Sequence, residues 1–357
     1  MFYHYRIIPY NLVFKKPAKT SRNTFREKSV YFLQLFDIRQ PTLFGIGEAA
    51  PLALLSIDDH QNFLSTFDDI VAQFCLTGQF EPVWQIQYPS MAFAIETALL
   101  DLKTGGKQIH YPTLMDSISK IKINGLVWMN EAHTMLTEAF ELVDSGYDCI
   151  KFKVGALDFD TECRMLEQFR KRHSAGKVLL RLDANGAFHP KEAKAQLKEL
   201  KRFGIHSIEQ PLKTQFVEEL AQLSDIQTID IALDESLIGV GPRQQKQQLL
   251  KTIKPQYIVL KPTLLGGLSQ TQEWIDLGDE LQIGHWITSA LESNIGLNAI
   301  AQFTLLQPVK PHQYQGLGTG SLFENNVESP WLAECGFLTY NKEAHWDLSI
   351  LENDIIK

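Results

Sequence analysis

The sequence predicts an α/β protein in which an eight-stranded β/α barrel follows a smaller α+β domain. Two patterns indicate this fold class: extended segments followed by a helix near the N-terminus, and short apolar runs that alternate with longer helical patterns beyond Lys122. The chain has 357 residues, of which 44% are hydrophobic. That length accommodates a barrel with one appended domain.

Residues 1 to 115 form the predicted N-terminal domain. Its extended segments include YFLQLFD at 31–37, and the composition of FGIGEAAPL at 44–52 indicates turns. Between Pro89 and Gly105, apolar residues repeat at helical spacing, and glycines then end the pattern. Strands followed by helices, without alternation, indicate an α+β domain.

Residues 116 to 320 form the predicted barrel, because apolar runs and helical patterns alternate there as in successive β/α units. The eight candidate strands are KINGLVWM from Lys122, CIKFKVG from Cys149, VLLRLDANG from Val178, SIEQP from Ser207, DIALDES from Asp230, YIVLKPT from Tyr257, HWITSALES from His285 and QYQGLGTG from Gln313. The tail, residues 321 to 357, holds no further β/α unit. We expect it to return and pack on the N-terminal domain.

Composition argues against several classes of partner. The 34 basic and 42 acidic residues give a net charge of -8 without a dense Lys/Arg block, so nucleic acid is not an expected partner. No run approaches the roughly 18 apolar residues of a membrane span, so membrane insertion is not expected. The start of the chain lacks the features of a secretory signal, and the four cysteines lack paired metal-type spacing. We expect a cytoplasmic protein; the sequence leaves open whether it forms a homo-oligomer.

Charged residues recur where the candidate strands end. Along the series Lys153, Asp183, Glu209, Asp234 and Lys261 the intervals are 30, 26, 25 and 27 residues, about one β/α unit each. Taken singly, such a charged residue is more often a solvated strand end, part of a turn or a helix start than a functional group. Groups at the carboxyl ends of consecutive barrel strands, however, converge on one face. The register of five such positions predicts an active site there.

Three carboxylates of the series predict a metal site. Asp183, Glu209 and Asp234 would repel one another if neighbouring strands brought them together without a cation. Ligation by oxygen alone favours magnesium or manganese over zinc. Such an ion would also bind a small-molecule carboxylate substrate and stabilise the negative charge that forms when the adjacent carbon loses a proton.

The lysines predict the groups that move this proton. An isolated lysine has a pKa of about 10.4, so a lysine base needs surroundings that favour its neutral form. Lys151 lies two residues before Lys153 on the same strand face. The positive charges of Lys151 and of the metal would lower the pKa of Lys153 and so favour its neutral form. Lys261, four strands further on, would face Lys153 across the ring as acid, electrostatic partner or second base. His285 is a weaker catalytic candidate and is expected in the core.

At these residues the chain resembles the enolase superfamily, in its muconate-lactonizing-enzyme-like subgroup. The similarity runs from GIGEAAPL through INGLVWM, IKFKVG, DANGAF, IEQP and LDES to GLGTG. Two further stretches, LKPTLLGG and TSALESNIGL, are similar to the o-succinylbenzoate synthases within that subgroup. Enolase-superfamily sites are a known case of a lysine or histidine base working with magnesium.

The resemblance implies a barrel of enolase-superfamily type with an N-terminal capping domain, and a role for each candidate residue. Asp183, Glu209 and Asp234 would bind magnesium, with Asn185 and Glu235 behind them. Lys153 would remove a proton from a succinylated hydroxycyclohexadiene carboxylate and return it to the departing hydroxyl, a dehydration of menaquinone biosynthesis. Lys261 would stabilise the enediolate, and Lys151 would help to keep the base neutral.

Substrate contacts are also implied by the resemblance. Residues 20–25 are the candidate lid, and Arg22 within it would meet the succinyl carboxylate. Thr288, Ser289 and Ser293 would supply hydrogen bonds to the substrate.

Three other functions stay open. The same lysine pair serves N-succinylamino-acid racemases and other epimerases or cycloisomerases of the subgroup. Dipeptide epimerases carry an Asp-x-Asp motif after the eighth strand, where this chain has GLGTG. A metal-independent aldolase would form a Schiff base on Lys153 or Lys261. A catalytically inactive scaffold would have no need to gather so many charges.

Overall fold

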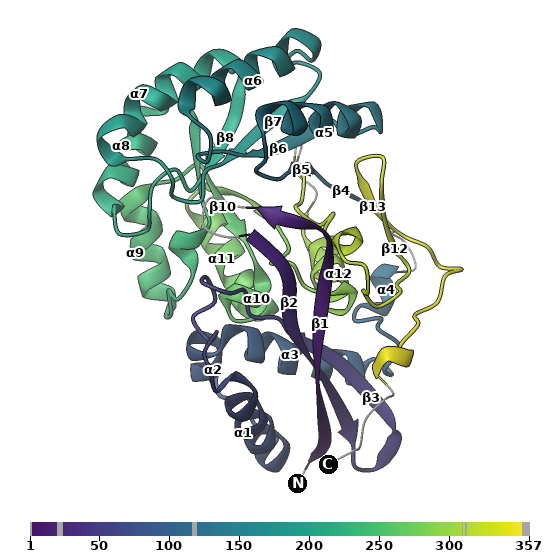
Figure 1. The fold of residues 1–357 in the computed structure, drawn as a ribbon. Helices are drawn as coiled ribbons and strands as arrows, with labels where there is room; N and C mark the ends of the chain where they lie inside the picture. Colours follow the sequence, from purple (N-terminus) through teal and green to yellow (C-terminus); the bar gives the residue numbers. More distant parts are fainter. Residues whose placement is uncertain (1, 20–23, 116–119, 309, 311–312, 352–357) are drawn as a thin grey trace.

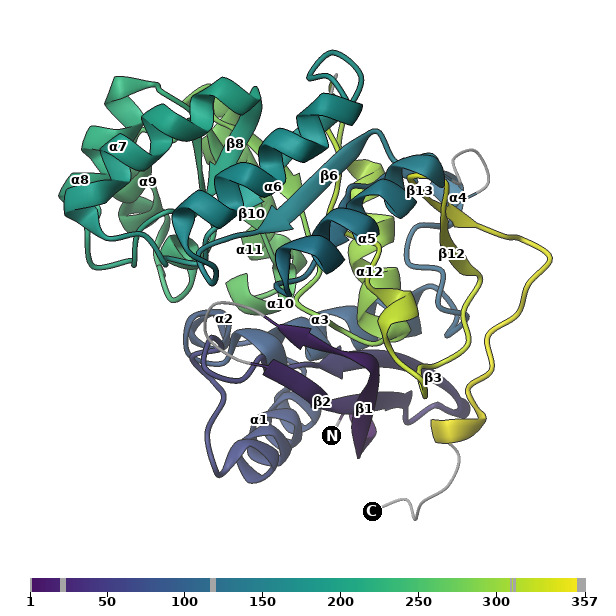
Figure 2. The same cartoon turned by 45° about the horizontal axis from the view of Figure 1, so that its top comes forward.

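The computed structural model describes residues 2–19, 24–115, 120–308, 310 and 313–351. Figure 1 shows an N-terminal sheet with its helices, in purple and dark blue, next to a larger body of alternating strands and helices in teal and green. In the turned view of Figure 2 the N-terminal sheet lies across one end of that larger body. Among the described residues, no helix has both the length and the apolar character that a membrane span needs.

Three antiparallel strands form the N-terminal sheet: β1 (Tyr3–Lys19), β2 (Thr24–Asp37) and β3 (Gln40–Ala49). Three helices accompany it: α1 (Phe63–Thr77), α2 (Pro82–Gln87) and α3 (Pro89–Lys103). The stretch that indicated turns instead provides the end of β3. A Cβ on Gly45 would collide with the carbonyl oxygen of Ala98, and one on Gly47 with that of Ala94. The glycines therefore serve to let α3 pack closely on β3.

Seven parallel strands form the second sheet and follow one another in chain order. They are β5 (Gly125–Val127), β6 (Cys149–Lys153), β7 (Leu179–Asp183), β8 (Ile205–Glu209), β9 (Asp230–Leu233), β10 (Tyr257–Leu260) and β11 (Gly284–Ile287). The connecting helices are α5 (Ala132–Asp144), α6 (Phe159–Arg172), α7 (Pro190–Leu200), α8 (Val217–Ile226), α9 (Arg243–Ile253), α10 (Pro262–Leu265), α11 (Leu268–Glu280) and α12 (Asn294–Leu306). The largest apolar cluster joins these strands to their helices. The chain thus has the alternating α/β, barrel-like fold that the sequence predicts.

The eighth candidate strand does not form a regular strand. Gln315 and Gly316 instead make isolated parallel bridges, to Ile123 just before β5 and to Thr288 just after β11. The backbone N–H of Gln315 donates to the carbonyl of Lys122 at 2.9 Å, and that of Gly316 to the carbonyl of Ile287 at 2.8 Å. The glycines that follow in GLGTG weaken strand formation. This short segment nevertheless hydrogen-bonds beside both edges of the sheet.

The first candidate strand is divided between two sheets. Its beginning overlaps β4 (Lys120–Lys122), which pairs antiparallel with β13 (Phe337–Tyr340), itself paired with β12 (Trp331–Glu334). Only β5 joins the parallel sheet. The remaining short helix, α4 (Pro112–Met115), precedes β4 in the chain.

Residues after 320 contact both parts of the chain. The rings of Phe323 and Phe14 lie 4.6 Å apart between centroids, and the N–H of Glu324 donates to the carbonyl of Val13 at 2.8 Å. Asn325 Oδ1 accepts from the N–H of Val13 at 2.8 Å. The tail thus holds β1 through residues 323–325 and β4 through the hairpin of β12 and β13.

Candidate active site

The structure brings the five residues of the charged series together. Lys153, Asp183 and Glu209 end β6, β7 and β8, and Asp234 and Lys261 directly follow β9 and β10. Lys153 is the register partner of Asp183, which in turn is the register partner of Glu209. Paired positions in neighbouring strands present their side chains on the same face of a sheet. The spacing in the sequence therefore corresponds to a real convergence.

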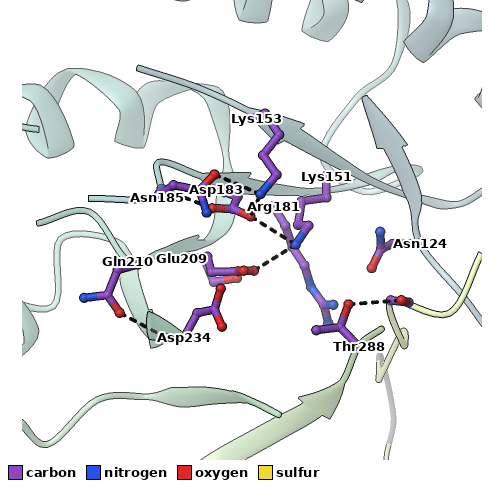
Figure 3. Close-up of polar contacts among 12 residues, drawn as sticks. Asn124, Lys151, Lys153, Arg181, Asp183, Asn185, Glu209, Gln210, Asp234 and Thr288 are labelled. Atoms are coloured by element: carbon purple, nitrogen blue, oxygen red, sulfur yellow. Dashed lines mark hydrogen bonds and ion pairs between the residues drawn. The ribbon is translucent and has the colours of Figure 1, made fainter. Parts of the chain in front are cut away.

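Two lysines of β6 contact two of the acids. The amine of Lys153 donates to Asp183 Oδ2 at 2.5 Å and to Asn185 Oδ1 at 2.9 Å. The amine of Lys151 donates to the same Asp183 oxygen at 3.2 Å and to Glu209 Oε2 at 3.0 Å. Figure 3 shows both side chains directed toward these carboxylates. Both lysines are more than nine-tenths buried, so the ion pairs are shielded from water.

A third lysine reaches the acids from another part of the sheet. Lys261 follows β10 and donates to Asp234 Oδ2. Three strands, β7, β8 and β9, separate β10 from β6 in the sheet. Lys261 and the two lysines of β6 thus approach the same group of acids from strands that are not neighbours.

Burial and charge act against each other in this cluster. Burial alone would raise the pKa of Asp183, but Lys153 and Lys151 outweigh it and hold this pKa well below the usual range. Burial raises the pKa of Glu209 to about 8, and the Asp183 charge adds to the rise. Burial would lower the pKa of Lys261, but Asp234 and Glu209 outweigh it and raise that pKa. Lys261 is therefore held as an ammonium ion.

The acids fit a divalent cation. Asp183, Glu209 and Asp234 offer oxygen atoms alone, which magnesium and manganese prefer. Glu209 Oε1 is buried and accepts no hydrogen bond from the described part of the chain, and a buried carboxylate oxygen calls for a positive partner. At present the lysine amines lie among the acids, and within the described ranges no three acidic, histidine or cysteine side chains are already set around one point. Cation binding would therefore move amines aside.

Asn185 and Glu235 lie next to the charged series. Asn185 accepts from Lys153, and its Nδ2 donates to Glu235 Oε1 at 2.9 Å. Its backbone has φ 46°, a left-handed conformation that asparagine tolerates better than most residues. This conformation and its contacts fix the Asn185 amide beside the Lys153 amine.

Gln210 is a site residue that the sequence analysis missed. Its Oε1 accepts from the backbone N–H groups of Asp234 and Ser236, both at 3.1 Å, and its Nε2 donates to the carbonyl of Leu212 at 2.9 Å. The residue is fully buried, with φ 38°. Gln210 thereby holds the turn that carries Asp234. Its place directly after Glu209, at the end of a candidate strand, was the available signal.

A cavity of about 260 Å³ borders the lysines. The amine-bearing residues Lys151, Lys153 and Lys261 line one part of it. Apolar side chains from the N-terminal domain and from the rest of the chain line other parts, among them Phe25, Leu54, Leu55, Trp128, Leu291 and Leu322. A concave site with mainly apolar walls and a group of polar side chains on one side is typical of a small-molecule site.

The three hydroxyl residues proposed to bind substrate have different positions. Thr288 and Ser289 line the cavity, where Thr288 donates to the carbonyl of Gly316 at 3.0 Å and Ser289 to Glu292 Oε2 at 2.6 Å. Ser293 does not line it. The Ser293 side chain is fully buried, accepts from the N–H of Ile295 and so caps α12. Ser293 is therefore a structural residue, because its hydroxyl is used at the helix end.

A buried charge network joins the N-terminal domain to the segment that carries these hydroxyl groups. Glu48 on β3 accepts from the hydroxyl of Ser293 and from its N–H at 2.8 Å. Lys28 on β2 donates to the carbonyl of Ala290 at 2.5 Å. Burial raises the pKa of Glu48 to about 7 and lowers that of Lys28 to about 8. Two strands of the N-terminal sheet thus hold residues 290–293.

Of two further candidates, one lies outside the described residues and the other lies away from the site. Arg22 and most of the candidate lid lie outside the described residues; Phe25, at its end, lines the cavity. His285 is buried and lines a different cavity, together with Arg181 and Trp286. Burial lowers the pKa of His285 to about 4. The expected core position of His285 is therefore confirmed.

Comparisons with known proteins agree on one family. Residues 134–344 match the family described as enolase C-terminal domain-like. The o-succinylbenzoate synthase of Desulfotalea psychrophila is 40% identical, over 92% of this chain and 96% of that protein. The crystal structure of MenC from Desulfotalea psychrophila has a TM-score of 0.81 and 36% identity, covering 95% of this chain and 100% of that one. The L-Ala-D/L-Glu epimerase of Bacillus subtilis is 27% identical over 81% of this chain and 80% of that protein.

Proposed function

This chain belongs to the enolase superfamily, and from that membership we propose that it is a lyase of the o-succinylbenzoate synthase type. It dehydrates a cyclohexadiene carboxylate that bears a hydroxyl and a succinyl group, and it yields o-succinylbenzoate for menaquinone biosynthesis. The 40% identity to such a synthase, over nearly the whole of both chains, supports this activity over that of the more distant epimerase.

The observation that carries the proposal is the meeting of lysines from β6 and β10 at one group of acids. Removal of a proton next to a carboxylate needs a base on one side and positive charge where the negative charge develops. Lys153, held by Asp183 and Asn185, supplies an amine at the cavity. Lys261, whose pKa the acids raise, supplies a lasting positive charge.

The chain's own residues divide the reaction into two proton transfers. The neutral amine of Lys153 takes the proton from the ring carbon that bears the carboxylate, and the electron pair of that C–H bond moves into the carboxylate as an enediolate. The pair then returns, the C–O bond to the hydroxyl breaks, and the Lys153 ammonium gives its proton to the departing oxygen. Water and an aromatic ring result, and Lys153 is neutral again. Lys261 stabilises the enediolate, and Lys151, two residues before Lys153 on the same strand, assists the base.

Asp183, Glu209 and Asp234 would hold magnesium, or manganese in its place, with Asn185 and Glu235 supporting the site. The bound ion supplies positive charge that stabilises the enediolate. The unpartnered oxygen of Glu209 and the raised pKa values of Glu209 and Asp234, both due first to burial, support this assignment.

We also propose that the chain has three parts with different roles. Residues 1–115 cap the site, with the lid near 20–25, and residues 116–320 form a closed barrel. Residues 321–357 return to the cap. Support comes from Phe25 and Leu54 in the cavity wall, from the hydrogen bonds of Gln315 and Gly316 beside both sheet edges, and from the contacts of residues 323–325 with β1. Four free thiols fit a cytoplasmic location.

Racemisation of an N-succinylamino acid is the second candidate, because amines on two sides of one cavity suit proton removal on one face and return on the other. Purified protein with magnesium should be given each substrate separately. Dehydration is followed by the absorbance of the aromatic product, and racemisation by exchange of the α-proton in deuterium oxide. We expect rapid dehydration that a chelator abolishes. Rapid racemisation without substantial dehydration would refute the proposal.

A further inference from the structure

Two buried polar atoms in the catalytic cavity have no hydrogen-bond partner among the residues that the structure describes. They are Asn124 Oδ1 and Thr319 Oγ1, on residues that are 5% and 7% exposed and that both line the cavity. Buried polar groups are nearly always hydrogen-bonded to protein or to an ordered molecule. The hydroxyl groups of Thr288 and Ser289, which line the same cavity, are already engaged. Two unpartnered groups in one substrate-sized cavity point to contacts that a ligand completes.

The backbone fixes both residues in advance. Asn124 directly precedes β5, and its N–H donates to the carbonyl of Gln315 at 3.0 Å. Thr319 is the residue directly before the short helix Gly320–Leu322, and its carbonyl accepts from the N–H of Leu322 at 3.1 Å. Its hydroxyl makes no capping hydrogen bond. Each side chain is thus anchored by its own backbone while an oxygen atom remains available.

Asn124 lies on the side of the cavity that carries the base. Strand β5 pairs with β6, and the ladder joins Leu126 to Lys151. Figure 3 shows Asn124 on the same side of the site as Lys151, away from Asp234. A group bound by Asn124 is therefore on the side of the cavity where β6 and Lys151 lie.

The chemistry of the substrate matches these two groups. Its carboxylates and keto group accept hydrogen bonds, and its ring hydroxyl is the one group that donates. Asn124 Oδ1 is an acceptor, so it suits the hydroxyl, whereas the Thr319 hydroxyl can donate to an oxygen of the succinyl arm. In a dehydration on one face, the hydroxyl must leave toward Lys153, and Asn124 is on that side.

We propose that Asn124 orients the departing hydroxyl of the substrate and that Thr319 binds the succinyl arm. This inference rests on the proposed dehydration. It assigns the recognition of the leaving group and of the succinyl arm to two uncharged residues. Asn124 precedes β5, and Thr319 follows the segment Gln315–Gly316, which bridges to Ile123 and Thr288.

Equilibrium binding of the product distinguishes the role of Asn124 from that of Thr319. The product, o-succinylbenzoate, keeps the succinyl arm that Thr319 would bind but has lost the ring hydroxyl that Asn124 would orient. Asn124→Leu should lower kcat/KM for dehydration by about 10- to 100-fold, mainly through kcat, while product binding stays within twofold. Thr319→Val should raise both KM and the Kd of the product by about tenfold with kcat retained, and Thr319→Ser should restore them. Thr137→Val, at an exposed helix position, is the matched control and should change nothing.

Thermal unfolding of each variant verifies that it folds. If the leucine side chain prevents Asn124→Leu from folding, Asn124→Ala takes its place. If the unaltered chain dehydrates the substrate while Asn124→Leu and Thr319→Val retain its kcat, KM and product Kd within twofold, the inference is overturned and the proposed function stands. Equal losses of substrate turnover and product binding in Asn124→Leu would also overturn the assigned role of Asn124. An unaltered chain that neither dehydrates the substrate nor binds the product would overturn both proposals.

Discussion

Lys153 and Asp183 are register partners on adjacent parallel strands, and the Lys153 amine lies 2.5 Å from Asp183 Oδ2. The same oxygen also accepts from Lys151 at 3.2 Å. The carboxylate that we propose as a metal ligand therefore holds two lysine amines in this structure. We expect a cation that binds Asp183 to displace these amines, so that metal binding changes the position of the proposed base.

Replacement of Lys153 tests the assignment of the base. Lys153→Ala should lower kcat for dehydration by about 10³-fold, because Lys151 precedes it by two residues on β6 and does not occupy the position from which Lys153 moves the proton. Magnesium should still raise the thermal unfolding midpoint of the variant. Steady-state kinetics measures kcat, and thermal unfolding with and without magnesium measures metal binding. Near-normal turnover of Lys153→Ala would show that Lys153 is not the base.

Replacement of Lys261 tests the stabilising charge. Lys261→Ala should lower kcat by about 10²- to 10³-fold, because the enediolate loses the ammonium that faces it. Arg243→Ala, which removes an exposed ion pair with Glu280, is the control and should leave kcat unchanged. Equal activity of Lys261→Ala and Arg243→Ala would contradict a catalytic role for Lys261.

Loss of Gln210 should weaken the turn that carries Asp234. Gln210→Leu leaves the buried N–H groups of Asp234 and Ser236 without their acceptor, so the free energy of unfolding should fall by about 2–4 kcal/mol. Magnesium affinity should fall as well. Urea unfolding and calorimetric titration measure the two effects, with exposed Gln244→Leu as control. A variant as stable as that control, with unchanged affinity, would show that Gln210 does not hold the turn.

Glu48 should make stability depend on pH. Its pKa is raised from 4.5 to about 7 by burial, so between these values the folded chain keeps a proton that the unfolded chain releases. The contribution of Glu48 to the free energy of unfolding therefore falls as pH rises through this window. Glu48→Gln cannot titrate and should gain on the order of 3 kcal/mol relative to the unaltered chain between pH 4.5 and 7.

Urea unfolding of both chains across this pH range tests the slope. Glu48→Gln also loses hydrogen bonds to Ser293 and Gly296, which lowers its free energy of unfolding by the same amount at every pH. The dependence of the free energy of unfolding on pH therefore reports the titration of Glu48 alone. The Glu292 charge adds to the raised pKa of Glu48, and the Glu48 charge in turn acts on Lys28, so Lys28→Met should change the window in which the slope occurs. Parallel curves for Glu48→Gln and the unaltered chain would contradict a raised pKa at Glu48.

Much of the fold and the charged part of the site can be predicted from the sequence, because both depend on local periodicity. Strand ends repeat at intervals of one β/α unit, and parallel strands place such ends together. This reasoning located Lys153, Asp183, Glu209, Asp234 and Lys261 near one another. The resemblance to the enolase superfamily, carried by the same motifs, is confirmed by the family match.

Features that depend on distant partners were not predictable. Ser293 was assigned to the substrate, but its hydroxyl donates to Glu48, a residue 245 positions away. Gly45 and Gly47 indicated turns, yet they accommodate the backbone of α3. Gln210 was missed because its role depends on the backbone N–H groups of Asp234 and Ser236, which follow the next strand of the sheet, β9. In each case tertiary packing, rather than local preference, decided the outcome.

Location of the cation tests the central claim most directly. Crystals grown with manganese, measured where manganese scatters anomalously, would reveal its position independently of activity. We expect one strong anomalous peak among the carboxylates of Asp183, Glu209 and Asp234, with the amines of Lys153 and Lys261 on opposite sides of the adjoining cavity. No peak at these acids, or a peak bound by other residues, would contradict the proposed site.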